Sequence, residues 1–160
     1  MRFGFGIDVG GTTVKLAFFD ETGIMLDKWE IPTNIENNGE RVLPDIADSI
    51  NNYLHAHDIG NGNIIGIGVG VPGPVNDDGI VNKCVNLGWG IKDLHGELSA
   101  LTGFPVKGGN DANVAALGEC WKGSGAGCKN MVMATLGTGI GGGVVLGGKI
   151  ISGSHGAGGE

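Results

Sequence analysis

The sequence is poor in cationic residues, proline and long apolar runs, and each shortage argues against a class of protein. Ten lysine and arginine residues against 17 aspartate and glutamate residues give a net charge of −7 over 160 residues. An acidic chain repels a phosphate backbone, so we expect no nucleic-acid partner. No run of 18 apolar residues occurs, so we expect no membrane span. The five prolines and the absence of a three-residue glycine period exclude a collagen-like chain.

Cysteine is also scarce. Cys84, Cys120 and Cys128 show no C-x-x-C spacing, and an odd, sparse set is typical of a reducing compartment, where a free thiol packs as a small apolar side chain. Met1-Arg2-Phe3 leads directly into a glycine-containing apolar segment, without the pattern of a signal peptide. The sequence therefore predicts a cytoplasmic protein.

Glycine is the residue in excess: its 34 copies are about three times the usual share. The glycines gather at the ends of apolar segments, and 41% of the residues are hydrophobic, which indicates tight turns within a folded core. Two glycine turns, at 8–15 and 136–143, each lie between apolar segments. Glycine amides approach an anion without obstruction, and threonine adds a hydroxyl donor, so the two turns together predict a clamp for a polyphosphate.

The apolar pattern before residue 123 predicts an α/β arrangement. The expected elements are, in order, strands at 3–7, 14–19 and 24–31, a helix at 40–57, a strand at 64–71, a helix at 93–102, a strand at 104–107 and a helix at 110–121. Asp93 is expected to cap the helix that ends before Gly103. Val114, Leu117 and Trp121 are expected to lie on one side of the last helix.

A weak internal repeat predicts a duplicated fold. The order strand, glycine turn, strand, turn, strand at 3–31 returns at 131–151, and this second copy stops at Glu160. We therefore expect one complete small α/β lobe, residues 1–117, and the beginning of a larger second lobe, residues 118–160. The chain is expected to be a truncated part of a longer protein.

The first glycine turn has a distinct set of polar groups. Asp8 ends a strand, where a carboxylate can hold a hydrated Mg²⁺ ion. Backbone amides, hydroxyls and one cation follow it, so that the candidate phosphate ligands are Gly10, Gly11, Thr12, Thr13 and Lys15. An Asp-Gly-type hairpin without a ligand is the alternative. The matching candidates in the second turn are Gly137, Thr138 and Gly139.

Three further segments carry candidate residues. At the start of a predicted helix, the dipole keeps Asp111 ionised and able to accept a hydrogen bond from a substrate hydroxyl, and Asn110 can bind a neighbouring hydroxyl; helix capping is the alternative. The glycine-rich end of the chain either places Glu160 on a polyol or is a flexible tail. Gly73, between two prolines after a buried strand, either ends that strand or belongs to a wall of the substrate site.

Taken in this order, the motifs resemble the ROK family of bacterial sugar kinases and repressors over essentially the whole chain. The segments that carry the resemblance are 8–15, 72–75, 110–113, 137–143 and 155–160. The resemblance implies an actin-like ATPase (ribonuclease H-like) fold of two α/β lobes, of which this chain has one full lobe and the opening β-hairpins of the second. It also implies ATP-dependent phosphorylation of a hexose at the 6-hydroxyl, with glucose as the first expected sugar.

The resemblance also implies residue roles. Asp111 matches the catalytic base, the sugar-binding positions are Gly73, Asn110, Asp111 and Glu160, and the two glycine turns match the phosphate loops, with Mg²⁺ near Asp8. His155 is not the zinc histidine of the family, and the three cysteines are not its zinc cluster, so zinc is expected only in a full-length parent. That parent is expected to be a homo-oligomer, a dimer or a tetramer. Without an adenine pocket, this chain alone is not expected to turn over.

Other functions remain open at this point. N-acetylmannosamine, N-acetylglucosamine, fructose and allose kinases share the scaffold. A sugar-sensing transcriptional repressor needs a helix-turn-helix domain ahead of the phosphate turn, and that turn begins at residue 8. A non-catalytic sugar-binding module is the third possibility, against which Asp111 and both phosphate turns count.

Overall fold

The computed structural model of the protein describes residues 1–136, 140–153, 156 and 158–159. Its centre is a five-stranded sheet of order β3-β2-β1-β4-β7. The strands of this sheet are β1 (Phe3–Val9), β2 (Thr13–Asp20), β3 (Met25–Pro32), β4 (Ile64–Val71) and β7 (Val106–Asn110). β1, β2 and β3 pair in antiparallel fashion, whereas β1, β4 and β7 are parallel. The carboxyl ends of the three parallel strands therefore lie at one edge of the sheet.

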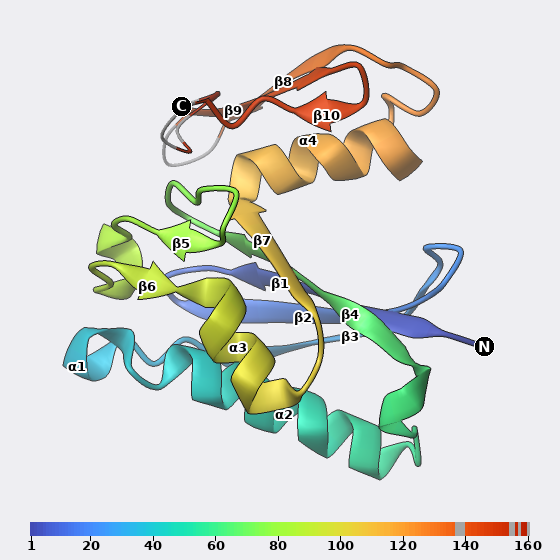
Figure 1. The fold of residues 1–160 in the computed structure, drawn as a ribbon, viewed down its shortest axis with the longest axis vertical. Coiled ribbons are helices and arrows are strands. Elements are labelled where there is room, and N and C mark those ends of the chain that lie inside the picture. Colours follow the sequence, from blue (N-terminus) through green and yellow to red (C-terminus); the bar gives the residue numbers. More distant parts are fainter. Residues whose placement is uncertain (137–139, 154–155, 157, 160) are drawn as a thin grey trace.

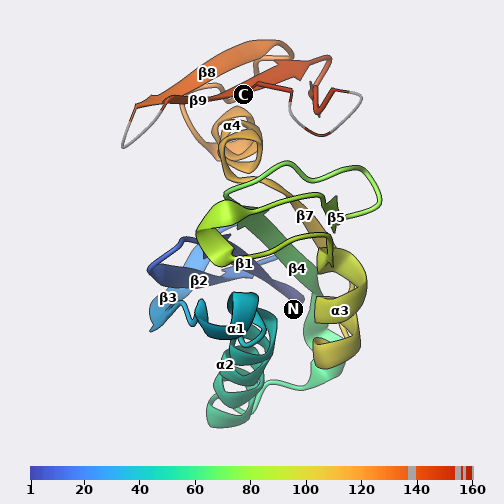
Figure 2. The same cartoon turned by 90° about the vertical axis from the view of Figure 1, so that its left-hand side faces the viewer.

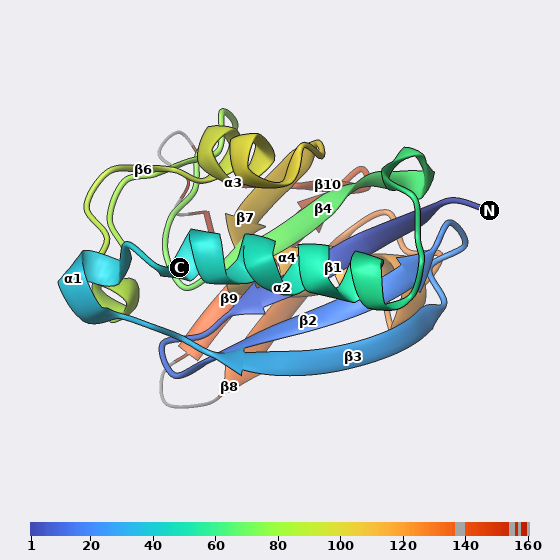
Figure 3. The same ribbon diagram turned by 90° about the horizontal axis from the view of Figure 1, so that it is seen from below.

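Helices cover both faces of this sheet. The helices are α1 (Glu36–Gly39), α2 (Val42–Ala56), α3 (Leu94–Thr102) and α4 (Asp111–Lys122). Figure 1 shows α2 and α4 on opposite faces of the sheet, and Figure 3 shows α3 beside α2. None of the helices in the described ranges is long and apolar enough to cross a bilayer.

The core lies between the sheet and α2. Alternate β1 residues, Phe5, Ile7 and Val9, point into this layer, because side chains alternate across a strand. The buried α2 residues recur at three- and four-residue steps, as predicted for one apolar face: Val42, Leu43, Ile46, Ala47, Ile50 and Leu54.

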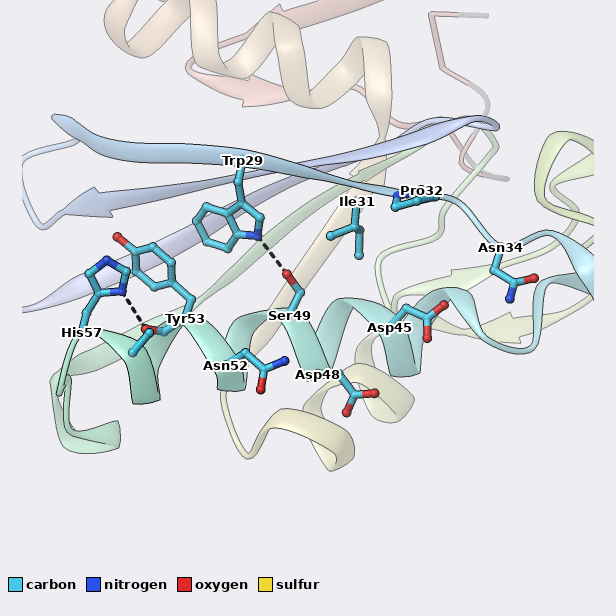
Figure 4. A pocket seen from close by; sticks show the side chains of 11 residues that line it. Trp29, Ile31, Pro32, Asn34, Asp45, Asp48, Ser49, Asn52, Tyr53 and His57 are labelled. Carbon is cyan, nitrogen blue, oxygen red and sulfur yellow. Dashed lines mark hydrogen bonds between the residues drawn. The ribbon is translucent and has the colours of Figure 1, made fainter.

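Aromatic side chains fix α2 to the edge strand β3. The Trp29 and Tyr53 rings stack with their centroids 4.4 Å apart, and His57 stacks on Tyr53 at 4.1 Å. Trp29 Nε1 donates to Ser49 Oγ at 2.8 Å. These residues line a groove of about 690 Å³ between β3 and α2. Figure 4 shows the groove on the α2 face of the sheet, with α4 on the other side.

Two helix caps lie where the sequence predicts the helices to begin. The Asp93 side chain accepts from Gly96 N at 2.8 Å and caps α3, which ends before Gly103 in the left-handed region. The Asn110 side chain caps α4 by accepting from Asn113 N at 3.1 Å. Both helix starts were predicted to within one residue and are confirmed.

The predicted bounds of β7 were wrong, and the apolar side of α4 is not the side that packs. The strand predicted at 104–107 runs from Val106 to Asn110, because the glycines at 108 and 109 pair with residues 69 and 70 of β4. The side of α4 that carries Val114, Leu117 and Trp121 is exposed, by 38, 45 and 61% at these residues. The helix buries its alanine face instead, at Ala112 and Ala116.

A second, smaller sheet follows α4. It consists of β8 (Met131–Leu136), β9 (Ile140–Leu146) and β10 (Lys149–Ile150) in the order β10-β9-β8, which repeats the order of β3-β2-β1. Figure 2 shows it lying over α4, on the far side from the central sheet. β9 begins at Ile140, inside the segment predicted as the second glycine turn, because Gly141–Gly143 pair with Met133–Thr135. α4 continues through residue 117, and the division into lobes at that point stays a prediction.

The remaining elements are short. η1 (Asn61–Asn63) lies between α2 and β4, whereas β5 (Ile80–Val81), η2 (Val85–Leu87) and β6 (Lys92–Asp93) connect β4 to α3. β5 and β6 pair as a small antiparallel ribbon. η2 places residues beside the first glycine turn, as described below.

The three cysteines are expected to differ in reactivity. Burial raises the pKa of the Cys84 thiol, which is 1% exposed, whereas Cys128 is exposed. Because the thiolate is the reactive form, a maleimide at pH 7.5 should label Cys128 first and Cys84 more than about tenfold more slowly. Mass spectrometry of timed samples measures both rates. Equal rates in the folded chain would contradict this environment for Cys84.

Candidate functional site

The carboxyl ends of β1, β4 and β7 open onto a cleft of about 760 Å³. The central sheet and its loops line one side with Asp8, Pro72, Asn86, Asn110 and Asp111. The opposite side is formed by residues that flank the second glycine turn: Thr135, Leu136, Ile140 and Gly141. Segments that are far apart in the sequence therefore share one cavity. Gly137, Thr138 and Gly139 themselves lie outside the described residues.

The first glycine turn is a closed hairpin turn. Gly10 N donates to Thr13 O at 3.0 Å, Thr33 Oγ1 donates to Gly10 O at 2.7 Å, and Thr33 N donates to Thr12 O at 2.9 Å. The Gly10 amide, which the sequence suggests would face an anion, is therefore used within the turn. Within the described residues, nothing accepts from the amides of Gly11 and Thr12. These two amides are the ones available to an anion.

Both glycines of this turn lie close to other backbone atoms. A Cβ built on Gly10 would lie 2.8 Å from Thr13 O, and one on Gly11 would lie 3.4 Å from Asn86 O. A side chain at Gly10 would collide with the turn itself. Glycine is therefore needed here for the geometry of the turn, in addition to any role in binding a ligand.

Asp8 and Lys15 are cross-strand neighbours at the rim of the cleft. Lys15 Nζ lies 3.9 Å from Asp8 Oδ2, and the two side chains are 68% and 60% exposed. A pair this open is worth about 0–1 kcal/mol. Both charges can therefore be redirected toward a ligand at little cost.

Asp111 is the first residue of α4 and is exposed to the cleft. Its Oδ1 accepts from Ala112 N at 2.8 Å, and the carboxylate lies beside the positive end of the helix dipole. A Cβ on Gly70 would lie 3.5 Å from the Asp111 Cα, so a glycine in β4 lets the start of α4 come close to the sheet. Gly70 also pairs with Asp8. The geometry places two carboxylates at the same edge of the sheet, Asp8 in β1 and Asp111 just after β7, with β4 between them. One can bind a cation there and the other a hydroxyl.

The other predicted sugar-site residues differ in their position relative to the cleft. Asn110 lines the cleft while it caps α4. Gly73 is buried: a Cβ there would lie 2.9 Å from Lys83 O, and its neighbour Pro72 reaches the cleft instead. Glu160 lies outside the described residues. The roles of all three stay predictions.

Asn86 is a cleft residue that the sequence analysis missed. It belongs to η2, its side chain is exposed, and its carbonyl lies against Gly11 of the first turn. The only signal in the sequence is a polar residue between Cys84 and Leu87, both of which are buried. Because a lone asparagine in a loop has many uses, that signal was too weak to single it out.

The sheet order, the repeated hairpins and the cleft between them define a protein of the actin-like ATPase fold, and the predicted fold class is confirmed. Residues 4–160 match the ROK family, and the chain belongs to it.

Known relatives agree with this assignment. A glucokinase from Halalkalibacterium halodurans is 48% identical over 160 residues, which cover 99% of this chain and 48% of the relative. A ROK family glucokinase from Streptomyces griseus, solved with glucose and AMPPNP, has a TM-score of 0.80 at 31% identity. The match covers 99% of this chain and 49% of the Streptomyces chain. A ROK family transcriptional regulator, a homologue of the E. coli MLC protein, has a TM-score of 0.85 at 25% identity. The match covers 99% of this chain and 40% of the regulator. The chain spans about half the length of these relatives.

Proposed function

We propose that the whole protein transfers the γ-phosphoryl group of ATP to the 6-hydroxyl of a hexose, with glucose as the first candidate. The observation that carries the proposal is the shared cleft, in which Asp8, Asp111 and the flanks of the second glycine turn line one cavity. Similarity to a glucokinase at 48% identity supports the choice of reaction and of sugar.

The residues of the first turn fit a polyphosphate with Mg²⁺. Mg²⁺ keeps several waters and needs only one or two protein carboxylates when it binds with phosphates, and Asp8 presents one exposed carboxylate. The amides of Gly11 and Thr12, the Thr12 and Thr13 hydroxyls and Lys15 would face the phosphate oxygens. The ion would neutralise charge on the transferring group. Gly137, Thr138 and Gly139 would supply the matching amides and hydroxyl from the other side.

Asp111 would act as the catalytic base. Its carboxylate orients the sugar hydroxyl and accepts its proton as the bond from oxygen to the γ-phosphorus forms and the bond to the β-phosphate oxygen breaks, releasing ADP. Phosphoryl transfer depends on positioning and charge more than on a strong nucleophile, so one carboxylate suffices. Gly73, Asn110 and Glu160 would hold the remaining sugar hydroxyls. The cytoplasmic location and the homo-oligomeric state stay predictions.

ADP release from the whole protein with a panel of hexoses and N-acetylhexosamines tests the proposal. We expect turnover with glucose and weaker turnover with the acetamido sugars. Turnover confined to an acetamido sugar would keep the reaction and change the substrate. Sugar binding without ADP release from any sugar would refute phosphoryl transfer and favour a sugar-binding or regulatory protein.

A further inference from the structure

The loop between β5 and β6, which contains η2, is attached to its surroundings at several points. Cys84 and Trp89 exchange both backbone hydrogen bonds at 3.0 Å. The buried Trp89 ring donates from Nε1 to Gly39 O at 3.1 Å. The Cys84 thiol donates to Pro72 O at 3.3 Å, just after the end of β4. The loop is therefore fixed both to the chain before α2 and to the strand end that borders the cleft.

The chain before α2 has a backbone shape that fits this loop. Asn37, Asn38 and Gly39 have successive φ values of +49, +60 and +66°, and positive φ is uncommon for residues other than glycine. A Cβ on Gly39 would collide with Leu87 O, and one on Gly88 would lie 3.0 Å from the Asn38 Cα. Such a backbone persists only where the surrounding structure determines it. These contacts therefore set the position of η2.

Asn86 is the η2 residue that lines the cleft. Its side chain is exposed and makes no hydrogen bond to another described residue. A Cβ on Gly11 would lie 3.6 Å from the Asn86 Cβ, and the carboxamide begins at the next carbon along the side chain. Its two N–H donors are therefore within reach of an anion that is bound by the amides of Gly11 and Thr12.

The Cys84 thiol relates Asn86 to the other end of the cleft. Burial raises the pKa of this thiol, the backbone amides of Leu87 and Asn86 oppose that effect, and the charge of Asp111 adds to it. The backbone of Asn86 and the carboxylate of Asp111 thus lie near the same sulfur atom. Asn86 therefore borders the space between Asp111 and the first glycine turn.

The charges of the cleft make a neutral donor at this place useful. Its described lining includes two carboxylates, Asp8 and Asp111, and no lysine or arginine. A phosphoryl group in transfer carries negative charge on its oxygens and is stabilised by donors that are already in position. Of the two asparagines in the lining, Asn110 uses its side-chain oxygen to cap α4. The fold makes no such use of the Asn86 side chain.

We propose that Asn86 binds the γ-phosphoryl group of the nucleotide. Its side-chain Nδ2 donates a hydrogen bond to a γ-phosphoryl oxygen that lies between Gly11 and Asp111, and this bond holds the group in line with the hydroxyl on Asp111. The inference rests on the proposed function, which supplies the identity of the nucleotide.

Nucleotide binding without sugar tests this role, because ADP lacks the γ-phosphoryl group. In the whole protein with Mg²⁺, Asn86→Ala should weaken the binding of AMPPNP about tenfold and leave the binding of ADP within about twofold of the original. Calorimetry measures both dissociation constants. A merely structural role would weaken both nucleotides alike, so equal losses would overturn the proposal, as would unchanged binding of AMPPNP.

A second variant and a control make the result specific. Asn86→Asp keeps the shape of the side chain but replaces the donors by a negative charge, so it should bind AMPPNP more weakly than Asn86→Ala does. Binding as tight as that of Asn86→Ala, or tighter, would place the side chain at the metal ion and overturn the proposal. Asn82→Ala changes an exposed asparagine of the same loop that does not line the cleft. Both nucleotides should bind this control as they bind the unaltered protein, and a selective loss of AMPPNP there would assign the effect to the loop as a whole and overturn the role of Asn86.

Turnover keeps this inference separate from the proposed function. Asn86→Ala should lower kcat ~10²-fold, as the loss of one positioned donor does, with a sugar KM within about threefold of the original. If the unaltered protein binds both nucleotides but phosphorylates no hexose, the proposed function fails, and the difference between AMPPNP and ADP still decides the role of Asn86. If it binds neither nucleotide, both the proposed function and this inference are wrong.

Discussion

Asp111→Ala lowers the sugar-dependent turnover of the whole protein by ~10²–10⁴-fold, the usual span for a lost general base. The carboxylate is exposed to the cleft at the start of α4, so its removal takes away the proton acceptor without emptying a core position. Asn110 continues to cap the helix, and the Tm should change little. ADP release at saturating sugar and ATP measures the effect.

Two comparisons make this result specific. Asp111→Asn keeps the shape of the side chain and loses only its basicity, so it should be nearly as inactive as Asp111→Ala. Asp48→Asn removes an exposed carboxylate on α2 that lies beside the groove of Figure 4 and not in the cleft, and turnover should be unchanged. Near-normal turnover of either Asp111 variant would refute its role as base.

Gly143→Val destabilises the chain by about 1–3 kcal/mol, the cost of adding atoms to a closely packed contact. The first added carbon would lie 2.5 Å from the Ala116 Cβ and 3.0 Å from a helix carbonyl, so β9 must move away from α4. Urea unfolding followed by circular dichroism measures the free energy of unfolding. Because α4 begins with Asp111, the variant should also lower turnover in the whole protein.

A double-mutant cycle attributes this loss to the contact between Gly143 and Ala116. Gly143→Ala should lower the free energy of unfolding of the unaltered chain. The same change should cost less in a chain that already carries Ala116→Gly, because that substitution removes the nearer of the two contacts. Gly118→Ala, on the open side of the same helix, should raise the free energy of unfolding by about 0.5–1 kcal/mol, since alanine favours a helix. Unchanged stability in Gly143→Val would show that β9 does not contact α4 in solution.

Much of the fold could be predicted because its signals are local. Alternating apolar residues define β1, the three- and four-residue steps define α2, and Asp93 and Asn110 mark helix starts by their capping chemistry. The repeat of the hairpin order was visible because the strands and turns recur at similar lengths. Such features depend only on residues that are close together in the sequence, so they can be recognised without the structure.

The errors come from glycine, whose role depends on distant partners. The glycines at 141–143 were grouped with the phosphate turn. In the structure they pair with β8, and those at 141 and 143 allow α4 to pack closely against β9. Those at 108 and 109 were left out of a strand because glycine carries no strand signal, although they pair with β4. The packed side of α4 was not predicted, because Val114, Leu117 and Trp121 are more apolar than the alanines that do pack.

The candidate site was predictable in part for the same reason. Asp8 and Asp111 stand at strand and helix ends that the sequence itself marks, and the structure brings both into one cleft. Asn86 could not be found in this way, because its position depends on a loop that folds back onto Gly11.

The distance between the Asp111 carboxylate and the sugar hydroxyl that receives the phosphoryl group tests the central claim most directly. It can be measured in a crystal structure of the whole protein with glucose and a non-hydrolysable ATP analogue. We predict a hydrogen bond of about 2.6–3.2 Å from the 6-hydroxyl to Asp111, with the γ-phosphate between the two glycine turns. A sugar bound away from Asp111, or a phosphate chain that touches only one of the turns, would contradict the account.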